Sequence, residues 1–263
     1  MARPEFITSP ANPLLKEVRR AVARGSLTSD GLMVAESFHL LEEALRSDLD
    51  VRVILAAAGV RGTIENHVKG LRGVRLLVVR DALLEQAGGV ETAQGVVALV
   101  RPPDWKLEQL FRGTALAVAL DGVQDPGNAG AIARAAEAFG ASGLLFLKGA
   151  VSPYNGKTLR ASAGSLFRVP FVAGVDAEVA LAAFRQRKLR VYAADPRGET
   201  ALGRADLRSP SAVVIGSEGR GVSDALRQGS HSVRIATRGV ESLNAAVAAG
   251  VILYESWRQR VRA

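Results

Sequence analysis

The chain alternates short apolar runs of strand length with stretches whose apolar residues recur at helical spacing. Runs such as 144–147 and 213–215 are built almost entirely from leucine, isoleucine, valine and phenylalanine, and they are flanked by glycine or polar residues. Short apolar strands that alternate with helices suit a mostly parallel sheet with helices covering both of its faces. The sequence therefore predicts an α/β fold.

The same patterns predict individual elements. Helices are expected at 13–23, 38–46, 128–139, 177–187 and the C-terminal end. Strands are expected at 32–35, 51–56, 74–79, 95–100, 115–120, 143–147, 190–194, 212–215 and 233–236. In the final helix, one stripe with the spacing of a buried face is formed by Leu243, Ala246, Val247, Gly250, Val251 and Tyr254.

Two adjacent prolines mark the expected domain boundary. Pro102 and Pro103 follow the apolar run 96–100 and lack the N–H donors that would extend a strand. The boundary separates residues 1–103 from residues 104–263. The first part holds 13 basic and 12 acidic residues and the second holds 21 and 14, so most of the net charge of +8 lies in the second part.

Composition excludes several classes of protein. The chain has no cysteine, which rules out disulfide scaffolds, zinc knuckles, iron–sulfur sites and thiol nucleophiles. The three histidines are far apart, so we expect no metal site. No apolar run approaches the roughly 20 residues of a membrane helix, and the first ten residues lack the apolar segment of a signal peptide. We therefore expect a soluble, cytoplasmic protein without a membrane partner.

The positive charge favours a polyanionic partner. The sequence pI is 10.4, and 28 of the 34 basic residues are arginine, which binds phosphates through two N–H groups and stacks on bases. Part of this charge, including Arg19 and Arg20, falls on the predicted first helix. Nucleic acid is the favoured partner, although charge that serves only solubility remains an alternative.

Polar and glycine residues gather after three of the predicted strands. The first cluster spans 121–130 and leads into a helix that contains Arg134, the second spans 216–221, and the third spans 237–244. Ligands bind beyond the carboxyl ends of strands in open parallel sheets. The three loops are therefore expected to enclose one small ligand.

Each cluster also has a purely structural interpretation. Asn128 and Ser242 could simply cap helices, and Arg134 could be an ordinary exposed arginine. Two phosphate motifs fail, because neither glycine cluster forms G-x-G-x-x-G and the sequence around Gly156-Lys157-Thr158 lacks the first glycine of a P-loop at the required position.

The clusters correspond to three motifs in a fixed order. They are Asp121-Gly122-Val123-Gln124-Asp125-Pro126-Gly127-Asn128 continuing to Arg134, Ile215-Gly216-Ser217-Glu218-Gly219-Arg220-Gly221, and Ser242-Leu243-Asn244 continuing to Gly250. Together they resemble the SpoU/TrmH family of the SPOUT class of RNA methyltransferases. The segment 7–13, the surroundings of Glu36 and the segment 94–96 are similar to the auxiliary RNA-binding domain of this family.

The resemblance implies a fold and an activity. Residues 104–263 would form a SPOUT catalytic domain with a deep trefoil knot around a mostly parallel sheet, and residues 1–103 a smaller α/β domain that binds the RNA substrate. The cofactor would be S-adenosyl-L-methionine, held in the knot, and the reaction would be methylation of a ribose 2′-hydroxyl in RNA, with 23S rRNA favoured over tRNA. The family is typically a homodimer with its site near the subunit interface.

The resemblance also implies roles for particular residues. The cofactor would contact Gly216, Ile235 and Leu243, and the polar face near the ribose would be formed by Arg134, Asn128, Glu218, Ser242 and Asn244. In the family the arginine matching Arg134 is often assigned as the general base. A guanidinium is a poor proton acceptor, so we favour a role in orienting phosphate and ribose oxygens.

Three alternatives remain open at this stage: a tRNA methyltransferase, an enzyme of the same fold that methylates a base, and a non-catalytic RNA-binding or ribosome-associated protein. One motif also departs from the family. Where the family usually has Ile-Pro-Met, this chain has Ile235-Ala236-Thr237, and the spacer to Ser242 is one residue short. The resemblance therefore implies an altered cofactor loop.

Overall fold

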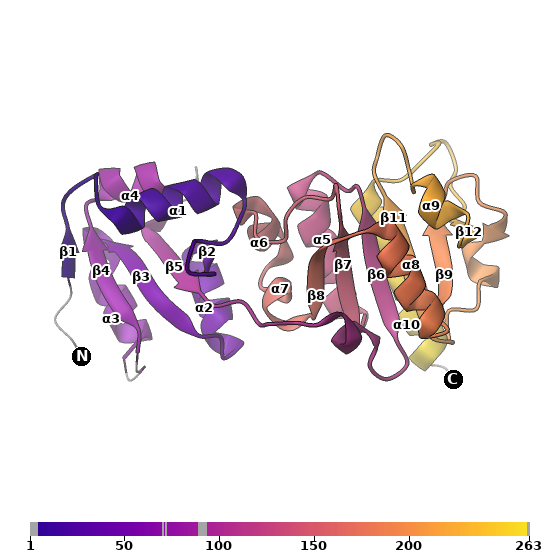
Figure 1. The fold of residues 1–263 in the computed structure, drawn as a ribbon, viewed down its shortest axis with the longest axis horizontal. Helices are drawn as coiled ribbons and strands as arrows, with labels where there is room; N and C mark the ends of the chain where they lie inside the picture. Colours follow the sequence, from indigo (N-terminus) through magenta and orange to yellow (C-terminus); the bar gives the residue numbers. More distant parts are fainter. Residues whose placement is uncertain (1–4, 70, 72, 89–93, 262–263) are drawn as a thin grey trace. The chain divides into compact units, whose positions relative to one another are not determined.

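A computed structural model describes residues 5–69, 71, 73–88 and 94–261 (Figure 1). The chain forms two compact units. The first comprises the chain up to Asp104 together with Tyr154–Phe167, and the second comprises Trp105–Pro153 and the chain from Arg168 onward. The segment 154–167 lies beyond the sequence boundary at 103, yet it packs with the first unit.

The first unit contains a five-stranded sheet in the order β1-β4-β3-β5-β2. Strands β1, β4 and β3 are parallel, and β5 is antiparallel to both β3 and β2. Its strands are β1 (Glu5–Ile7), β2 (Met33–Glu36), β3 (Val51–Ala57), β4 (Arg75–Val79) and β5 (Val96–Val100). Its helices are α1 (Pro13–Arg24), α2 (Phe38–Arg46), α3 (Arg61–His67), α4 (Asp81–Ala87) and α6 (Gly156–Ser162), with a short 3-10 helix η1 (Ala58–Val60) and with α7 (Ser165–Arg168) at the unit boundary.

Helices cover both faces of this sheet (Figure 1). Helices α1 and α4 share a core with one face, while α2 and α3 pack on β5 and β3 from the other. Local sequence sets the limits of α1. The side chain of Asn12 accepts a hydrogen bond from the Leu14 N–H at 2.9 Å, Pro13 fits the first turn, and Gly25 ends the helix at φ +57°.

The segment 154–167 fits closely into the first unit. Glu36, only 1% exposed, accepts a hydrogen bond from Arg160 Nη1 at 3.2 Å. A Cβ atom on Gly156 would lie 2.5 Å from the Glu36 carboxylate, and one on Gly164 would lie 2.8 Å from Glu43. The stretch that resembles the end of a P-loop is therefore the start of a helix packed against a buried carboxylate, which disfavours phosphate binding there.

The second unit contains a seven-stranded sheet in the order β10-β12-β9-β11-β6-β7-β8, in which every pair is parallel. The strands are β6 (Leu116–Asp121), β7 (Gly143–Leu147), β8 (Phe171–Val175), β9 (Arg190–Ala194), β10 (Thr200–Ala201), β11 (Ser211–Gly216) and β12 (His231–Arg234). The helices are α5 (Pro126–Ala138), α8 (Ala177–Gln186), α9 (Asp224–Arg227) and α10 (Ala245–Val261), with 3-10 helices η3 (Leu107–Phe111) and η4 (Leu202–Arg204). The structure thus confirms an α/β fold with a mostly parallel sheet.

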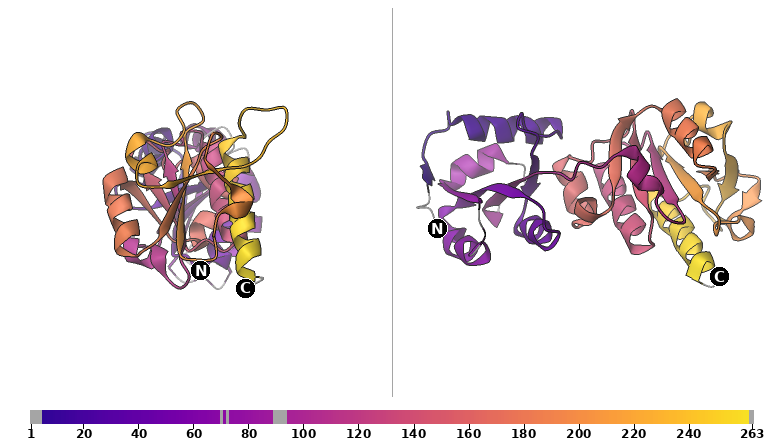
Figure 2. Two further views of the ribbon diagram at one scale, coloured as in Figure 1. Left: turned by 90° about the vertical axis from the view of Figure 1, so that its right-hand side faces the viewer. Right: turned by 60° about the horizontal axis from the view of Figure 1, so that its bottom comes forward.

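The helices of the second unit form a layer on each face of the sheet. Phe184 and Ala180 of α8 share a core with alternate residues of β6, β9 and β11. Helices α10 and α5 pack against each other, and α10 also contacts β11. Figure 2 shows α10, in yellow, lying along the sheet. Because the helices lie on the two faces of the sheet, the carboxyl ends of the strands are surrounded by loops.

The prediction for the buried face of α10 was wrong. Val247, Val251 and Tyr254 are exposed in the described chain, and Leu243 precedes the helix. The residues that pack inward are Ala245, Ala249, Ile252, Leu253 and Ser256. Both faces of the helix carry apolar residues, so spacing alone could not identify the face with the small side chains that allow close packing against α5.

Candidate active site

A cavity of about 740 Å³ opens at the carboxyl ends of the parallel strands, where the sequence predicts a ligand site. Five of the expected site residues line it: Gly216, Glu218, Ile235, Ser242 and Leu243. They come from two of the three loops expected from the sequence. The motifs after β11 and β12 therefore meet at one cavity.

Gly216 ends β11 where the next loop folds back on itself. A Cβ atom at this position would lie 2.1 Å from the carbonyl carbon of Gly221 and 2.2 Å from the nitrogen of Val222. Ser217 and Gly221 exchange backbone hydrogen bonds of 2.9 and 3.1 Å across the loop. No side chain fits at position 216, so glycine is required for this wall of the cavity to form.

Three expected residues from the three motifs form a hydrogen-bonded chain. Asn128 Nδ2 donates to the carboxylate of Glu218, and Asn244 Nδ2 donates to Asn128 Oδ1 at 2.9 Å. The first of these pairs joins residues 90 positions apart in the sequence and the second joins residues 116 apart. The structure therefore brings Asn128, Glu218 and Asn244 together, with Glu218 at the cavity.

The capping interpretations of Asn128 and Ser242 are both wrong. Asp125 caps α5, because its carboxylate accepts from the Asn128 N–H at 2.7 Å. Asn244 caps α10, because its Oδ1 accepts from the N–H groups of Ala246 and Val247. Asn128 is thus free to reach Glu218, and Ser242 lines the cavity without a capping bond.

Arg134 lies apart from this cluster. It occupies the exposed side of α5, six residues after Asn128, and it does not line the cavity. Within the part of the chain that the structure describes, its guanidinium makes no hydrogen bond or ion pair. Arg134 is therefore exposed and available to a partner molecule.

One loop of the site and one supporting residue were not predicted from the sequence. Asp195 and Arg197, in the loop after β9, also line the cavity. They do so because β9 lies between β11 and β12, a strand order that the sequence does not reveal. Asp121 lies within the first motif, and its carboxylate accepts from the Ser223 N–H at 2.7 Å, which ties the end of β6 to the loop after β11.

The cavity fits the cofactor that the resemblance implies. Its volume is within the range of about 300–1,000 Å³ typical of small-molecule sites. Leu243 and Ile252 provide apolar surface, while Glu218, Asp195 and Glu241 provide carboxylates. This combination suits S-adenosylmethionine, which carries an apolar adenine face and a positively charged sulfur.

Neither a metal-binding cluster nor a membrane-spanning helix occurs among the described residues. They contain no group of three or more histidine, aspartate or glutamate side chains placed to hold a metal ion. Among the helices that the structure describes, none has the length and apolar character needed to cross a membrane.

Comparison with solved structures gives full-length matches. A SpoU methyltransferase, AviRb from Streptomyces viridochromogenes, solved in complex with AdoMet, matches with a TM-score of 0.85 and 28% identity, covering 96% of this chain and 100% of that one. A structure described as an RNA 2′-O ribose methyltransferase matches with a TM-score of 0.80 and 32% identity, covering 97% and 99%.

Comparison of sequences agrees. The model of the SpoU rRNA Methylase family matches residues 115–254. An uncharacterised tRNA/rRNA methyltransferase of Synechocystis sp. is 32% identical over 262 residues, which cover 97% of this chain and 94% of that protein. The family resemblance read from the three motifs is confirmed. The chain belongs to the SpoU rRNA methylase family and is an RNA methyltransferase that uses S-adenosylmethionine.

Proposed function

We propose that this protein methylates a ribose 2′-hydroxyl of ribosomal RNA. The observation that carries the proposal is the hydrogen-bonded chain of Asn244, Asn128 and Glu218 beside the cavity. It presents a fixed carboxylate next to the space that suits the cofactor. A related structure with 32% identity is described as an RNA 2′-O ribose methyltransferase, which supports ribose as the acceptor.

The reaction needs positioning and a proton acceptor. When bound, S-adenosylmethionine supplies a methyl group on a positively charged sulfur, which becomes neutral as the carbon–sulfur bond breaks. The ribose oxygen forms the new bond to carbon and gives up its proton. Holding that oxygen in line with the methyl group is itself a large part of catalysis.

Glu218 is the proton acceptor in this proposal. Asn128 engages Oε1 of its carboxylate, and within the described chain Oε2 has no hydrogen-bond partner. The free oxygen can accept the hydroxyl proton and pass it to solvent. The amide of Asn128, itself held by Asn244, keeps the carboxylate pointing in one direction.

Arg134 orients the RNA rather than removing the proton. Its exposed, unpaired guanidinium suits two oxygens of a phosphate or ribose. The pH–rate profile of Arg134→Lys in single turnovers tests this role. Reduced activity with an unchanged profile is expected, whereas a displaced ionisation with partial activity would mean that residue 134 is the base.

The activity itself is tested with labelled cofactor and purified RNA. Incubation with 23S rRNA or with tRNA should transfer label to the rRNA, and alkaline hydrolysis should then leave labelled, alkali-resistant dinucleotides. Label on tRNA would favour the tRNA alternative, and label in alkali-sensitive mononucleotides would indicate base methylation. Failure to bind S-adenosylmethionine at millimolar concentration would support a non-catalytic protein.

We also propose that the enzyme is a homodimer joined through α10. Val247, Val251, Tyr254 and Trp257 form an exposed apolar stripe along this helix, with Val247 51% exposed. Such a continuous stripe commonly marks a protein interface. Because α5, which carries Arg134, packs against α10, a partner at this face would also lie near α5.

The remaining parts of the proposal follow family membership. We propose a trefoil knot in the second unit, an RNA-binding role for the first unit and a cytoplasmic location alongside the ribosomal substrate. The solvent-exposed side of α1 carries Lys16, Arg19, Arg20 and Arg24, which supports RNA binding by that unit.

A further inference from the structure

Charge differs between the two ends of the strands in the seven-stranded sheet. We call the side with the carboxyl ends of the strands the acidic edge and the side with their amino ends the basic edge. Leaving aside the two-residue strand β10, the segments at the carboxyl ends of the strands hold six basic and nine acidic residues; they are 121–126, 148–153, 176–178, 195–199, 216–227 and 234–244, including the last strand residues 121, 216 and 234. The segments at the amino ends of the same strands, with the end of α10, hold eleven basic and four acidic residues; they are 105–115, 137–142, 168–170, 185–190, 202–210, 228–230 and 255–261, of which 202–210 also follows β10. The strong positive charge thus lies away from the cofactor cavity.

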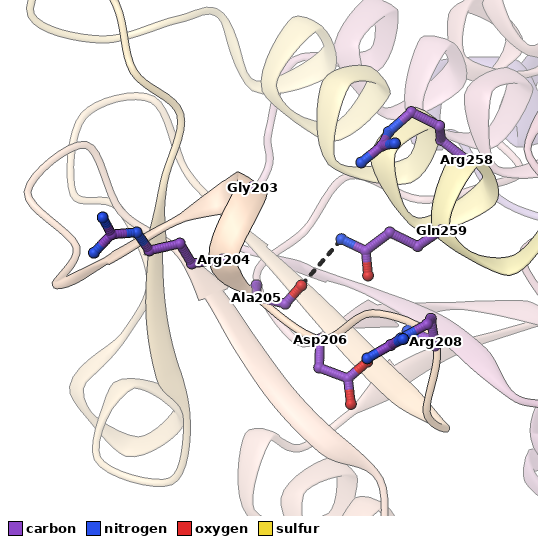
Figure 3. A pocket seen from close by; sticks show the side chains of 7 residues that line it. All are labelled: Gly203, Arg204, Ala205, Asp206, Arg208, Arg258 and Gln259. Carbon is purple, nitrogen blue, oxygen red and sulfur yellow. Dashed lines mark hydrogen bonds and ion pairs between the residues drawn. The ribbon is translucent and has the colours of Figure 1, made fainter. Parts of the chain in front are cut away.

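A second cavity, of about 380 Å³, lies within this basic region (Figure 3). It is lined by 203–206, Arg208, Arg258 and Gln259, which come from the segment before β11 and the end of α10. The two cavities share no lining residue, and β11, which runs from the segment 205–210 to Gly216, spans six residues and is therefore about 20 Å long. They are separate sites.

The backbone of this second cavity is held rigidly. Arg260 donates to the carbonyl oxygens of Thr114, Ala115, Leu207 and Ser209 at 2.7 to 3.1 Å. These neutral acceptors leave its positive charge without a carboxylate partner. Burial lowers the pKa of Arg260 below its usual value.

The carboxylate in the cavity is already neutralised. Asp206 Oδ1 accepts from Arg208 Nε at 3.1 Å, and Oδ2 accepts from Arg190 at 2.9 Å. The hydrogen bond from Arg208 holds the pKa of Asp206 below its usual value, so the group stays ionised and satisfied. By contrast, Arg204 in the cavity and Arg112, which does not line it, are exposed, and their side chains make no hydrogen bond or ion pair within the described residues.

We infer that this basic edge of the second unit, defined by the segments that lead into its strands and centred on the arginine-lined cavity, binds phosphate groups of the RNA substrate at a distance from the methyl-transfer site. Arginine side chains with free N–H groups recognise phosphodiester oxygens. The inference rests on RNA being the substrate. In this arrangement, cofactor binding and RNA phosphate binding take place on different sides of the unit. The acidic edge suits a cationic cofactor, and the basic edge suits a polyanion.

Charge reversal at two unpaired residues tests the inference. The double variant Arg112→Glu/Arg204→Glu is compared with Arg112→Lys/Arg204→Lys, which keeps the charge. The dissociation constants for poly(U) and for transcribed 23S rRNA are measured at several salt concentrations, together with that for S-adenosylmethionine. The glutamate variant should bind both RNAs about tenfold more weakly, and the slope of log Kd against log salt concentration should fall by about 0.7 for each phosphate that is no longer neutralised. The lysine variant should resemble the wild type.

The outcomes distinguish this inference from the proposed function. Unchanged RNA affinity and salt dependence in the glutamate variant, with wild-type cofactor affinity, would overturn the inference and leave the methyltransferase intact. A wild-type protein that bound neither RNA would contradict both. If the glutamate variant lost cofactor affinity through misfolding, the neutral variant Arg112→Gln/Arg204→Gln would decide, with unchanged RNA affinity again overturning the inference.

Discussion

Gly216 sets the shape of the cavity proposed to hold the cofactor, because its missing side chain makes room for the backbone of the same loop. In Gly216→Ala, the new Cβ would overlap the Gly221 carbonyl carbon, which is 2.1 Å away. Forcing these atoms apart should cost about 1–3 kcal/mol of folding free energy and open the cavity wall. Urea unfolding and calorimetry with S-adenosylmethionine should show lower stability and weaker cofactor binding.

Gly219 provides the matched control for this prediction. It lies in the same loop, and a Cβ there would meet no atom within 4 Å. Gly219→Ala should therefore leave stability and cofactor affinity close to those of the wild type. If both variants behaved alike, the close approach at Gly216 would not be what shapes the loop.

Glu218 is the residue whose loss should affect chemistry more than binding. Glu218→Gln keeps the shape of the side chain but removes the proton acceptor, so single-turnover methyl transfer should fall by about 10²-fold or more. Affinity for S-adenosylmethionine should fall less than the rate, because the carboxylates of Asp195 and Glu241 remain in the cavity, and affinity for RNA should change little. Asn128→Ala is the companion variant, since it releases the carboxylate from its fixed direction. A Glu218→Gln enzyme with a near-normal rate would exclude Glu218 as the acceptor.

For individual residues, the sequence identified the members of the candidate site but not their hydrogen-bond partners. Asn128 and Glu218 could be selected from their motifs, but a bond across 90 residues depends on β6 and β11 being neighbours. The capping roles were misassigned because the two helices begin elsewhere: Asp125 accepts from the Asn128 N–H at the start of α5, and Asn244 accepts from the N–H groups of Ala246 and Val247 at the start of α10. Local patterns indicate which residue types can cap, and the folded backbone decides which of them does.

Among the elements, those with a strong local signal were predictable. The helix at 38–46 and the strands at 143–147 and 190–194 have the expected limits. Sequence patterns did not predict β1, which has three residues, or α6, which depends on packing against a buried Glu36. Elements stabilised mainly by tertiary contacts carry little sequence periodicity.

Helix α10 is the element on which the proposed homodimer depends. Val251→Glu/Tyr254→Glu places two charges in the exposed apolar stripe, where they would be desolvated in a dimer. The variant should be monomeric in light-scattering measurements, while its inward face, with Ile252 and Leu253, keeps the helix folded. Val179→Glu on α8, where Val179 is also exposed, should remain dimeric. A monomeric wild type would contradict the homodimer.

Over the whole molecule, the net charge of +8 is divided between surfaces of different units. Lys16 and Arg24 lie on the exposed side of α1, and their side chains make no hydrogen bond or ion pair within the described chain. Arg20 is paired with Glu17 at 2.6 Å, which makes it a less informative site for mutation. We therefore expect the proposed RNA binding by the first unit to depend most directly on Lys16 and Arg24.

The last prediction combines the two surfaces. Lys16→Glu/Arg24→Glu should weaken binding of transcribed 23S rRNA and reduce its salt dependence, while Lys69→Glu, a reversal at an exposed lysine beyond α3, should have little effect. If one RNA molecule contacts both units at once, the reductions in binding free energy in this variant and in Arg112→Glu/Arg204→Glu should add in the quadruple variant, because separate sites contribute independently. The opposite result is a quadruple variant that binds RNA with the same affinity as whichever double variant has the lower affinity. That result would mean that the two surfaces do not hold the same RNA molecule.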